Sequence, residues 1–439
     1  MSDRDSPAGA PIGAGFLYAS ARRLIAVKPG EIPALAWAWL YIFAVLSSYY
    51  IMRPIREQMA VAGGVQNIQW LFTATLAGLL LLNVPFAYLV KTLPRSRFIP
   101  ITYRFFAANI LLFAVILHFT DAAHSVWIGR AFFVWISIFN LFVVSVFWAL
   151  VVDVFNSEQA KRLFGFIAAA ATIGAICGSS ITASLARHVP VELLLIGAAL
   201  LLEVAVVAVR GLSRLSAALH ARPDERGELP IGGSLLAGVV NPFRSRYLAN
   251  ISVFILLFAI TSTFLYFQQA TLVRDNFHDR ASQTAFFAQI DLAVNVLTLI
   301  VQLFFTGRIL GFLGVGLTLM VLPLLTMFGF GTLALMPAIS TLVIFQVLRR
   351  SSDYAIARPT REVLYTVVPR EDRYKAKNFI DTVVYRAGDQ IGAWSYALVA
   401  VLGFGPRLLA VIAIGLAVVW LINAWWLGRR QDAMARAST

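Results

Sequence analysis

Charged residues are scarce in this chain of 439 residues, and that scarcity excludes most classes of soluble protein. Aspartate, glutamate, lysine and arginine together make up 13 % of the sequence, whereas hydrophobic residues make up 59 %. A soluble domain carries roughly a quarter of its residues as charged side chains. A disordered chain combines low hydrophobicity with high charge. Neither description fits, so the composition indicates a protein that crosses a membrane several times.

Several chemical signatures are also missing. The single cysteine, Cys177, excludes a disulfide-stabilised scaffold. The five histidines have no metal-ligand spacing, so we expect no metal and no other cofactor. The sequence contains no phosphate-binding G-x-x-x-x-G-K-[ST] loop and no catalytic nucleophile motif. We therefore expect neither ATP hydrolysis nor any enzyme activity.

Apolar segments are present instead, and a helical span needs about 20 mainly apolar residues. Twelve segments meet this length, at 33–60, 68–90, 99–119, 126–153, 163–187, 190–210, 247–270, 283–306, 312–334, 338–362, 377–402 and 405–427. The sequence thus predicts an all-α membrane protein with about twelve transmembrane helices.

Basic residues gather in alternate loops, and this pattern accounts for the net charge of +14. Lysine and arginine mark the cytoplasmic side of a membrane protein. We therefore predict that the tail 1–32, the linker 211–246 and the tail 428–439 are cytoplasmic, in a bacterial inner membrane. Topology explains the charge, so no nucleic acid is expected. The expected partners of a monomeric protein are the lipid bilayer and a small anionic substrate.

The long linker divides the chain into two halves of six spans, 33–210 and 247–427. It carries the segment RPDERGELPIGG, whose charges, glycines and prolines are typical of a linker. Two six-span halves joined in this way indicate a major-facilitator-type transporter, whose binding site lies at the midplane between the halves.

The two halves also share a sequence pattern. After the fourth and the tenth span, a charged loop is followed by Phe-Ile and then by a GxxxG pair, Gly174 and Gly178 in the first half and Gly388 and Gly392 in the second. A GxxxG pair lets two helix backbones approach closely. The alternative is chance, because apolar helices look alike. We favour a duplication and predict two pseudo-symmetric halves.

Ionisable residues near the end of the first span are the first functional signal, because charge inside a membrane is costly and usually faces a cavity. Tyr49, Arg53 and Arg56 have spacings that place them on one helix face, and Glu57 lies four residues after Arg53. The alternative is that the span stops at Met52 and the charges reach the outer interface. We predict that this group faces a cavity.

The tenth span carries more arginines than an apolar span normally does. Arg349, Arg350, Arg358 and Arg361 accompany Asp353, and Arg349 is expected to reach that aspartate four residues away. Arginine binds phosphate and carboxylate through paired, charge-assisted hydrogen bonds. We predict that at least one of these arginines binds an anionic substrate. The alternative is a cytoplasmic mouth whose arginines contact lipid headgroups.

A polar stripe follows one face of the eighth span. Thr284, Asp291, Asn295 and Gln302 lie within roughly 60° of one another on a helix, so the stripe is expected to line the cavity. Asp291 is the best candidate for a proton-coupling site or for the partner of an arginine. The competing interpretation is hydrogen bonding between helices.

Further candidates lie in the fourth and eleventh spans, where Arg386 and Asp389 are spaced to pair. The predicted substrate-binding set is Tyr49, Arg53, Arg56, Glu57, Trp148, Asn295, Arg349, Arg350, Asp353, Arg358 and Arg361. The predicted coupling or gating set is Asp153, Lys161, Asp291, Asp381, Arg386 and Asp389.

Two sequence blocks carry a family resemblance. One joins Phe147-Trp148 to EQAKRLFG at 158–165, and the other is the region 358–392. The second block contains Thr360-Arg361-Glu362, Tyr365, Pro369, Lys375, Lys377, Ile380-Asp381, Arg386 and Gly388. Together with the basic and acidic end of the first span, these blocks resemble the ATP/ADP translocase family of plastids and intracellular bacteria.

The resemblance implies a major-facilitator-like fold and, in the best-known members, exchange of ATP for ADP and phosphate. Three positions depart from the family pattern. Arg56 and Arg361 stand where the family has lysine, and Asp389 stands where it has lysine after the glycine, which reverses the charge. Anion transport is therefore expected more firmly than nucleotide exchange.

These observations predict a secondary transporter that moves an anionic solute by alternating access, with nucleotide exchange of the ATP/ADP type as the leading interpretation. One alternative is proton-coupled transport of another organic anion or metabolite, with Asp291 or Glu57 binding the proton. An alternative from another class is a membrane receptor or assembly protein that transports nothing.

Overall fold

The computed structural model describes residues 27–92, 95–120, 125–155, 157–219, 245–369 and 376–438. The regular structure of these residues is helical throughout, which confirms the predicted all-α class. Most of the predicted tail 1–32 and the central part of the predicted linker, 220–244, lie outside the described residues.

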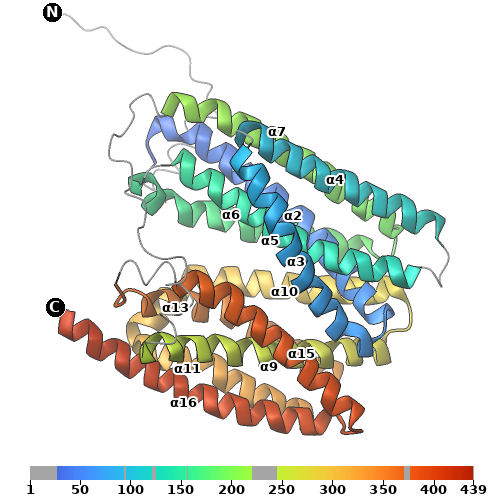
Figure 1. Ribbon diagram of the computed structural model, residues 1–439, viewed down its shortest axis with the longest axis vertical. Helices are drawn as coiled ribbons and strands as arrows, with labels where there is room; N and C mark the ends of the chain where they lie inside the picture. Colours follow the sequence, from blue (N-terminus) through green and yellow to red (C-terminus); the bar gives the residue numbers. More distant parts are fainter. Residues whose placement is uncertain are drawn as a thin grey trace, which may run out of the picture.

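The first half of the chain forms the upper bundle of Figure 1. Its helices are α2 (Ile32–Ala62), α3 (Ile68–Thr92), α4 (Arg95–Phe119), α5 (Ser125–Val154), α6 (Ser157–Leu185) and α7 (Val191–Leu219). The short 3₁₀ turns η1 (Pro29–Glu31) and η2 (Val65–Asn67) precede α2 and α3. Each long helix coincides with a predicted span, and α7 continues into the predicted linker.

The second half forms the lower bundle. Four of its spans are single long elements: α9 (Arg246–Asn276), α10 (Arg280–Phe304), α11 (Thr306–Leu335) and α16 (Pro406–Ser438). Helix α11 is kinked at Gly314, whose φ is 71°. The tenth span consists of α12 (Ile339–Ser352), η3 (Asp353–Ala357) and α13 (Arg358–Leu364). The eleventh contains η4 (Ile380–Val384) and α15 (Tyr385–Val401). Helix α16 runs on through the predicted tail 428–439 as far as Ser438.

Ten helices of the described residues are long and apolar enough to cross a membrane. The remaining two predicted spans are helical as well, but the π-helical turns η3 and η4 divide them. Pro359 explains part of the first division, because proline has no N–H to donate to the carbonyl of Ala355. The hydroxyl of Thr306 donates to that carbonyl instead, at 2.7 Å. All twelve predicted spans are therefore present.

Both GxxxG pairs pack against the first helix of their own half. A side-chain carbon added at Gly174 would lie 2.5 Å from the carbonyl oxygen of Phe43, on α2. One added at Gly392 would lie 3.1 Å from the carbonyl oxygen of Ile260, on α9. Only glycine allows the backbones to approach this closely. The fifth helix of each half thus packs on the first helix in the same way, which supports the predicted pseudo-symmetry.

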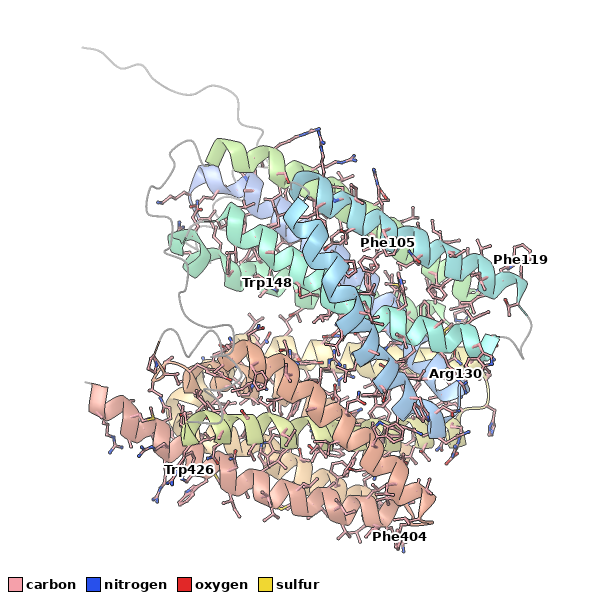
Figure 2. All side chains as sticks on the ribbon, viewed as in Figure 1. Phe105, Phe119, Arg130, Trp148, Phe404 and Trp426 are labelled. Carbon is pink, nitrogen blue, oxygen red and sulfur yellow. The ribbon has the colours of Figure 1, made fainter. Side chains whose placement is uncertain are left out.

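Large apolar side chains cover the outside of both bundles, as expected for a surface that contacts lipid rather than water. Phe105 and Phe119 on α4 are 59 % and 82 % exposed. Figure 2 places both along the outer edge of the first half. The interior of each half holds its own apolar cluster, built around residues such as Tyr41 and Phe139 in the first half and Trp420 and Phe254 in the second.

The two ends of the molecule differ. The start of α2, the end of α7 and the start of α9 lie at one end (Figure 1), here called the linker end, and the opposite end is called the far end. Several contacts join the halves toward the far end. The Thr73 hydroxyl lies 2.9 Å from the side-chain oxygen of Gln390, and the rings of Trp70 and Trp394 are 4.8 Å apart. Packed contacts therefore close the far end.

Candidate functional site

A cavity of about 280 Å³ lies between the two halves and collects most of the charged residues of the spans. Helices α2, α3 and α5 line it from the first half, and α9, α10, α12, η3, α13 and α15 line it from the second. The charged lining residues are Arg53, Arg56, Glu57, Asp291, Arg349, Arg350, Asp353, Arg358, Arg386 and Asp389. Six arginines thus face four carboxylates, and the excess of positive charge favours an anionic ligand.

Asp291 on α10 is held by two arginines at the centre of this group. Nη1 of Arg53 lies 2.6 Å from Oδ1 of Asp291, and Nη1 of Arg350 lies 2.8 Å from the same oxygen. The Asp291 side chain is only 3 % exposed. The prediction that Asp291 partners an arginine is confirmed, with one arginine contributed by each half.

Arg56 and Glu57 form a second pair, at the far-end side of α2. The guanidinium of Arg56 pairs with the Glu57 carboxylate and also donates to the Ser137 hydroxyl at 3.3 Å. It lies 5.1 Å from the ring centre of Phe133, a cation–π distance. Arg53 is 3.9 Å from the same carboxylate. Arg53, Arg56 and Glu57 of the predicted group at the end of the first span therefore face the cavity, whereas Tyr49 does not line it.

The π-helical turn η3 positions a third pair. Nε of Arg358 lies 3.0 Å from Oδ2 of Asp353, and its guanidinium lies 4.5 Å from the ring centre of Tyr354. The carbonyl of Tyr354 accepts a hydrogen bond from the Gln302 side chain at 3.3 Å. The expected pairing of Asp353 with Arg349 was wrong, because the π turn brings Arg358 to this carboxylate.

The fourth pair belongs to α15. Nη1 of Arg386 lies 3.1 Å from Oδ2 of Asp389, which confirms the predicted pairing. The Thr263 hydroxyl lies 3.4 Å from the other oxygen of this carboxylate. Because Asp389 neutralises Arg386, the residue that reverses the family charge also removes one positive charge from the cavity wall.

Arg349 is bound by neutral groups. It donates to the hydroxyls of Thr326 at 3.1 Å, Ser262 at 3.0 Å and Thr261 at 3.0 Å, and to the carbonyl of Phe258 at 3.3 Å. Arg349 is 3 % exposed. Dipoles hold this guanidinium in place without cancelling its charge, so it contributes directly to the positive potential of the cavity.

The arginine side chains that line the cavity become more exposed toward the linker end. The side chains of Arg350 and Arg53 are 14 % and 16 % exposed, that of Arg386 is 33 % exposed, and that of Arg358 is 51 % exposed. Arg358 begins α13, which leads to the linker end. A solute would therefore reach the buried arginines from the linker end.

Some predicted residues lie away from the cavity. Tyr49 is buried beside Tyr50, and Trp148 packs between Phe147 and Phe164 inside the first half. Asn295 is buried and bonds the Asp291 carbonyl at 2.8 Å. Of the polar stripe on the eighth span, only Asp291 lines the cavity.

Four further candidates lie toward or at the linker end. Arg361 and Asp381 do not line the cavity, and Asp381 is exposed. The side chains of Asp153 and Lys161 lie outside the described residues. The structure therefore gathers ten of the predicted residues in one cavity, and five other described candidates do not line it: Tyr49, Trp148, Asn295, Arg361 and Asp381.

The sequence-based prediction missed several neutral residues of the site. Tyr266, Ser262 and Ser137 line the cavity, and Thr326 holds Arg349. The run Thr261-Ser262-Thr263 in an otherwise apolar helix was a usable signal. Ser137 and Thr326 gave none, because serine and threonine in apolar helices commonly bond their own backbone.

Comparison with known proteins bears on this architecture. No protein-family model matches the sequence. The ADP,ATP carrier protein 1 of Chlamydia pneumoniae is 22 % identical over 345 residues, which is 68 % of this chain and 66 % of the carrier. The chain thus matches slightly less than two thirds of that relative's length.

Solved transporters share the fold. A bacterial homologue of the iron transporter ferroportin, in an inward-facing state, aligns with 91 % of this chain and 98 % of its own, at 11 % identity and a TM-score of 0.63. A bacterial homologue of the human lysosomal transporter Spinster covers 93 % and 98 %, at 13 % identity and a TM-score of 0.56. The nucleoside transporter NupG covers 91 % and 99 %, also at 13 % and 0.56.

These similarities confirm the predicted architecture and the family resemblance. The matched proteins are transporters rather than enzymes, and the solved ones cover more than 90 % of this chain. The chain is therefore a multi-pass membrane protein of the major-facilitator fold, and a distant homologue of a bacterial ADP,ATP carrier.

Proposed function

We propose that this protein is a secondary transporter that moves an anionic solute between the two sides of a membrane by alternating access. The observation that carries the proposal is the cavity between the halves, where six arginines face four carboxylates. Charge in a membrane-embedded cavity is costly unless it serves a solute or a partner. An anion that binds there restores the charge balance.

We further propose that the anion is a nucleotide, exchanged in the manner of ATP and ADP. The distant homology to an ADP,ATP carrier supports this choice. Arginine suits phosphoryl groups because its planar fork of donors matches two oxygens at once. Phe72, Phe258, Phe287 and Tyr266 line the same cavity and offer apolar faces to a nucleobase.

Counterflow in proteoliposomes tests the proposal. Vesicles containing the purified full chain and loaded with ADP should take up labelled ATP, and Arg53→Ala should abolish the uptake. Arg104→Ala is the matched control, because Arg104 pairs with Glu203 on the outside of the first half at 3.2 Å. The absence of counterflow with every nucleotide tested would contradict the nucleotide proposal.

Proton-coupled uptake of another organic anion is the second candidate, because the buried carboxylates Asp291 and Glu57 line the same cavity. It predicts uptake driven by a pH gradient and lost in Asp291→Asn. A receptor without transport activity predicts instead that Arg53→Ala is tolerated and that no anion raises the thermal unfolding midpoint of the purified protein.

We also propose that the linker end faces the cytoplasm of a bacterial cell. Arg210, Arg214, Arg246, Arg429 and Arg430 all belong to helix ends at the linker end, as the positive-inside rule requires. A reporter fused after α16 should then be active only if it functions in the cytoplasm.

A further inference from the structure

One ion pair inside the cavity joins the two halves of the molecule. Arg53 belongs to α2 of the first half, whereas Asp291 and Arg350 belong to α10 and α12 of the second. Oδ1 of Asp291 accepts from Arg53 at 2.6 Å and from Arg350 at 2.8 Å. One carboxylate therefore neutralises an arginine of each half, and its contact with Arg53 crosses between the halves.

The other carboxylates that line the cavity contact an arginine of their own half. Glu57 pairs with Arg56 on α2. Asp353 pairs with Arg358 at 3.0 Å, and Asp389 pairs with Arg386 at 3.1 Å, both within the second half. A movement of one half relative to the other leaves these pairs intact, but it must stretch the pair formed by Arg53 and Asp291.

The position of this pair decides which movement it opposes. Arg53 lies in the last third of α2, on the far-end side of that helix, and Asp291 lies near the middle of α10. Opening of the far end separates them. Arg53 then keeps only the Glu57 carboxylate, which is 3.9 Å away and already paired with Arg56, and this partial loss of counter-charge inside a cavity is unfavourable. Asp291 keeps Arg350 as a partner when it leaves Arg53.

We propose that Asp291 is an internal counter-anion that keeps the far end closed while the cavity is empty, and that an anionic substrate releases the far end by replacing Asp291 on Arg53. This inference rests on the proposed transport of an anion. It implies that the empty carrier changes state rarely and the loaded carrier readily. Because only the loaded carrier changes state readily, Asp291 makes the import of one anion depend on the export of another.

Spin labels on the two halves test the inference without any ligand. Gln66 in η2 and Arg274 in α9 are exposed residues near the far end, one from each half. Cysteines at these positions, in a full chain with Cys177→Ser, carry the labels in lipid nanodiscs. Asp291→Asn should raise the ratio of open to closed far ends about tenfold, within the range usual for coupling between two states.

Arg53→Gln removes the other partner of the pair and should produce the same shift, which guards against misfolding of a single variant. Asp389→Asn is the matched control, because Asp389 lines the same cavity but pairs within its own half. Unchanged label distances in both pair variants, or an equal shift in Asp389→Asn, would overturn the inference.

ADP separates this inference from the proposed function. If proteoliposomes show nucleotide counterflow, ADP should shift the label distances toward those of the open far end in the protein whose cavity residues are unsubstituted. The absence of that shift would overturn the inference. If counterflow is absent for all nucleotides, the nucleotide proposal fails by itself. The ligand-free comparison of Asp291→Asn with Asp389→Asn still decides whether Asp291 holds the far end closed.

Discussion

The two halves of the molecule share a scaffold but differ in what they contribute to the cavity. In each half a GxxxG pair on the fifth helix packs against the first helix. Gly174 and Gly178 contact α2 in the first half, and Gly388 and Gly392 contact α9 in the second. The backbone contacts are therefore repeated. This repetition is expected if close helix packing is what a duplicated half must retain in order to fold.

The charged groups of the cavity are distributed unequally. The first half supplies Arg53, Arg56 and Glu57, all from the end of α2. The second half supplies the other seven charged lining residues from α10, α12, η3, α13 and α15. This difference shows that two halves can share their helix packing and still contribute different chemical groups to the cavity wall. One half can act mainly as a wall with a single charged helix, while the other carries most of the binding groups.

The largest expected effect on stability comes from substitutions that disrupt the helix packing shared by the two halves. A side-chain carbon at Gly178 would collide with the carbonyl oxygen of Ser47, whereas at Gly392 the nearest atoms, Cβ of Thr263 and the carbonyl oxygen of Ile260, are 2.9 and 3.1 Å away. Gly178→Ala should therefore lower the free energy of unfolding by about 3 kcal/mol, and Gly392→Ala by about 1 kcal/mol. Thermal unfolding in detergent, monitored by circular dichroism, measures both.

Gly197→Ala controls for the effect of alanine itself. Gly197 lies in α7, and a side-chain carbon there meets no atom within 4 Å. Alanine favours a helix over glycine by up to about 1 kcal/mol, so this variant should be neutral or slightly more stable. Equal losses at Gly178 and Gly392 would contradict the expectation that the helix contact at Gly178 is the tighter of the two.

Local pattern was sufficient to predict the scaffold. Apolar length located all twelve spans, because a membrane-spanning helix must satisfy its backbone internally and present apolar side chains to lipid. The charges of the first and tenth spans were also recognisable, since a charged side chain in an apolar helix usually faces a cavity or a charged partner. Arg53, Arg350 and Asp291 could therefore be chosen as candidates without knowledge of the fold.

The partners of those charges could not be predicted, because they depend on how helices far apart in sequence are placed. Nothing in the sequence indicates that Asp291 lies between Arg53 and Arg350. The π-helical turn η3 added a second difficulty. It shifts the helical phase of the residues that follow, by about one residue or 100°. The regular spacing of four residues assigned Asp353 to Arg349, whereas the turn brings Arg358, five residues after Asp353, to this carboxylate.

A smaller expected effect tests the difference in charge between the halves through the affinity for the anion. Arg349 of the second half is buried among hydroxyls, and its charge is not neutralised by an ion pair within 4 Å in the described residues. Arg349→Gln should weaken nucleotide binding about tenfold, the size expected for one charge acting over roughly 10 Å at an effective dielectric constant near 20. Isothermal titration of the purified protein with ADP measures the change.

Arg349→Lys distinguishes charge from shape. Lysine keeps the positive charge but cannot reproduce the planar set of four hydrogen bonds. If the role of Arg349 is electrostatic, Arg349→Lys should retain most of the affinity that Arg349→Gln loses, and added salt should reduce the difference between these variants. Equal affinities for the lysine and glutamine variants would show that Arg349 acts through its hydrogen bonds instead.

The smallest expected effect is on stability, and it concerns two ion pairs that lie outside the membrane spans or at their linker-end margin. Burial alone would raise the pKa of Glu31, but hydrogen bonds from Arg162, the Lys28 N–H and Gln159 outweigh it and hold that pKa below its ordinary value of 4.5. The unfolded chain thus binds the proton more readily, so the pair stabilises the fold above about pH 4.5 and the stabilisation is lost as the pH falls further. In the second half, by contrast, Glu362 and Lys377 are 2.6 Å apart but 59 % and 34 % exposed.

Glu31→Gln should therefore lower the free energy of unfolding at pH 7 by about 1 to 2 kcal/mol, with a difference from the unsubstituted protein that shrinks in acid. Glu362→Gln should change it by less than about 1 kcal/mol, because water screens an exposed pair. Thermal unfolding of both variants between pH 3.5 and pH 7, at about 0.15 M salt, makes the comparison. A constant gap between Glu31→Gln and the unsubstituted protein across that range would mean that packing, rather than the charge of Glu31, ties the start of α2 to α6.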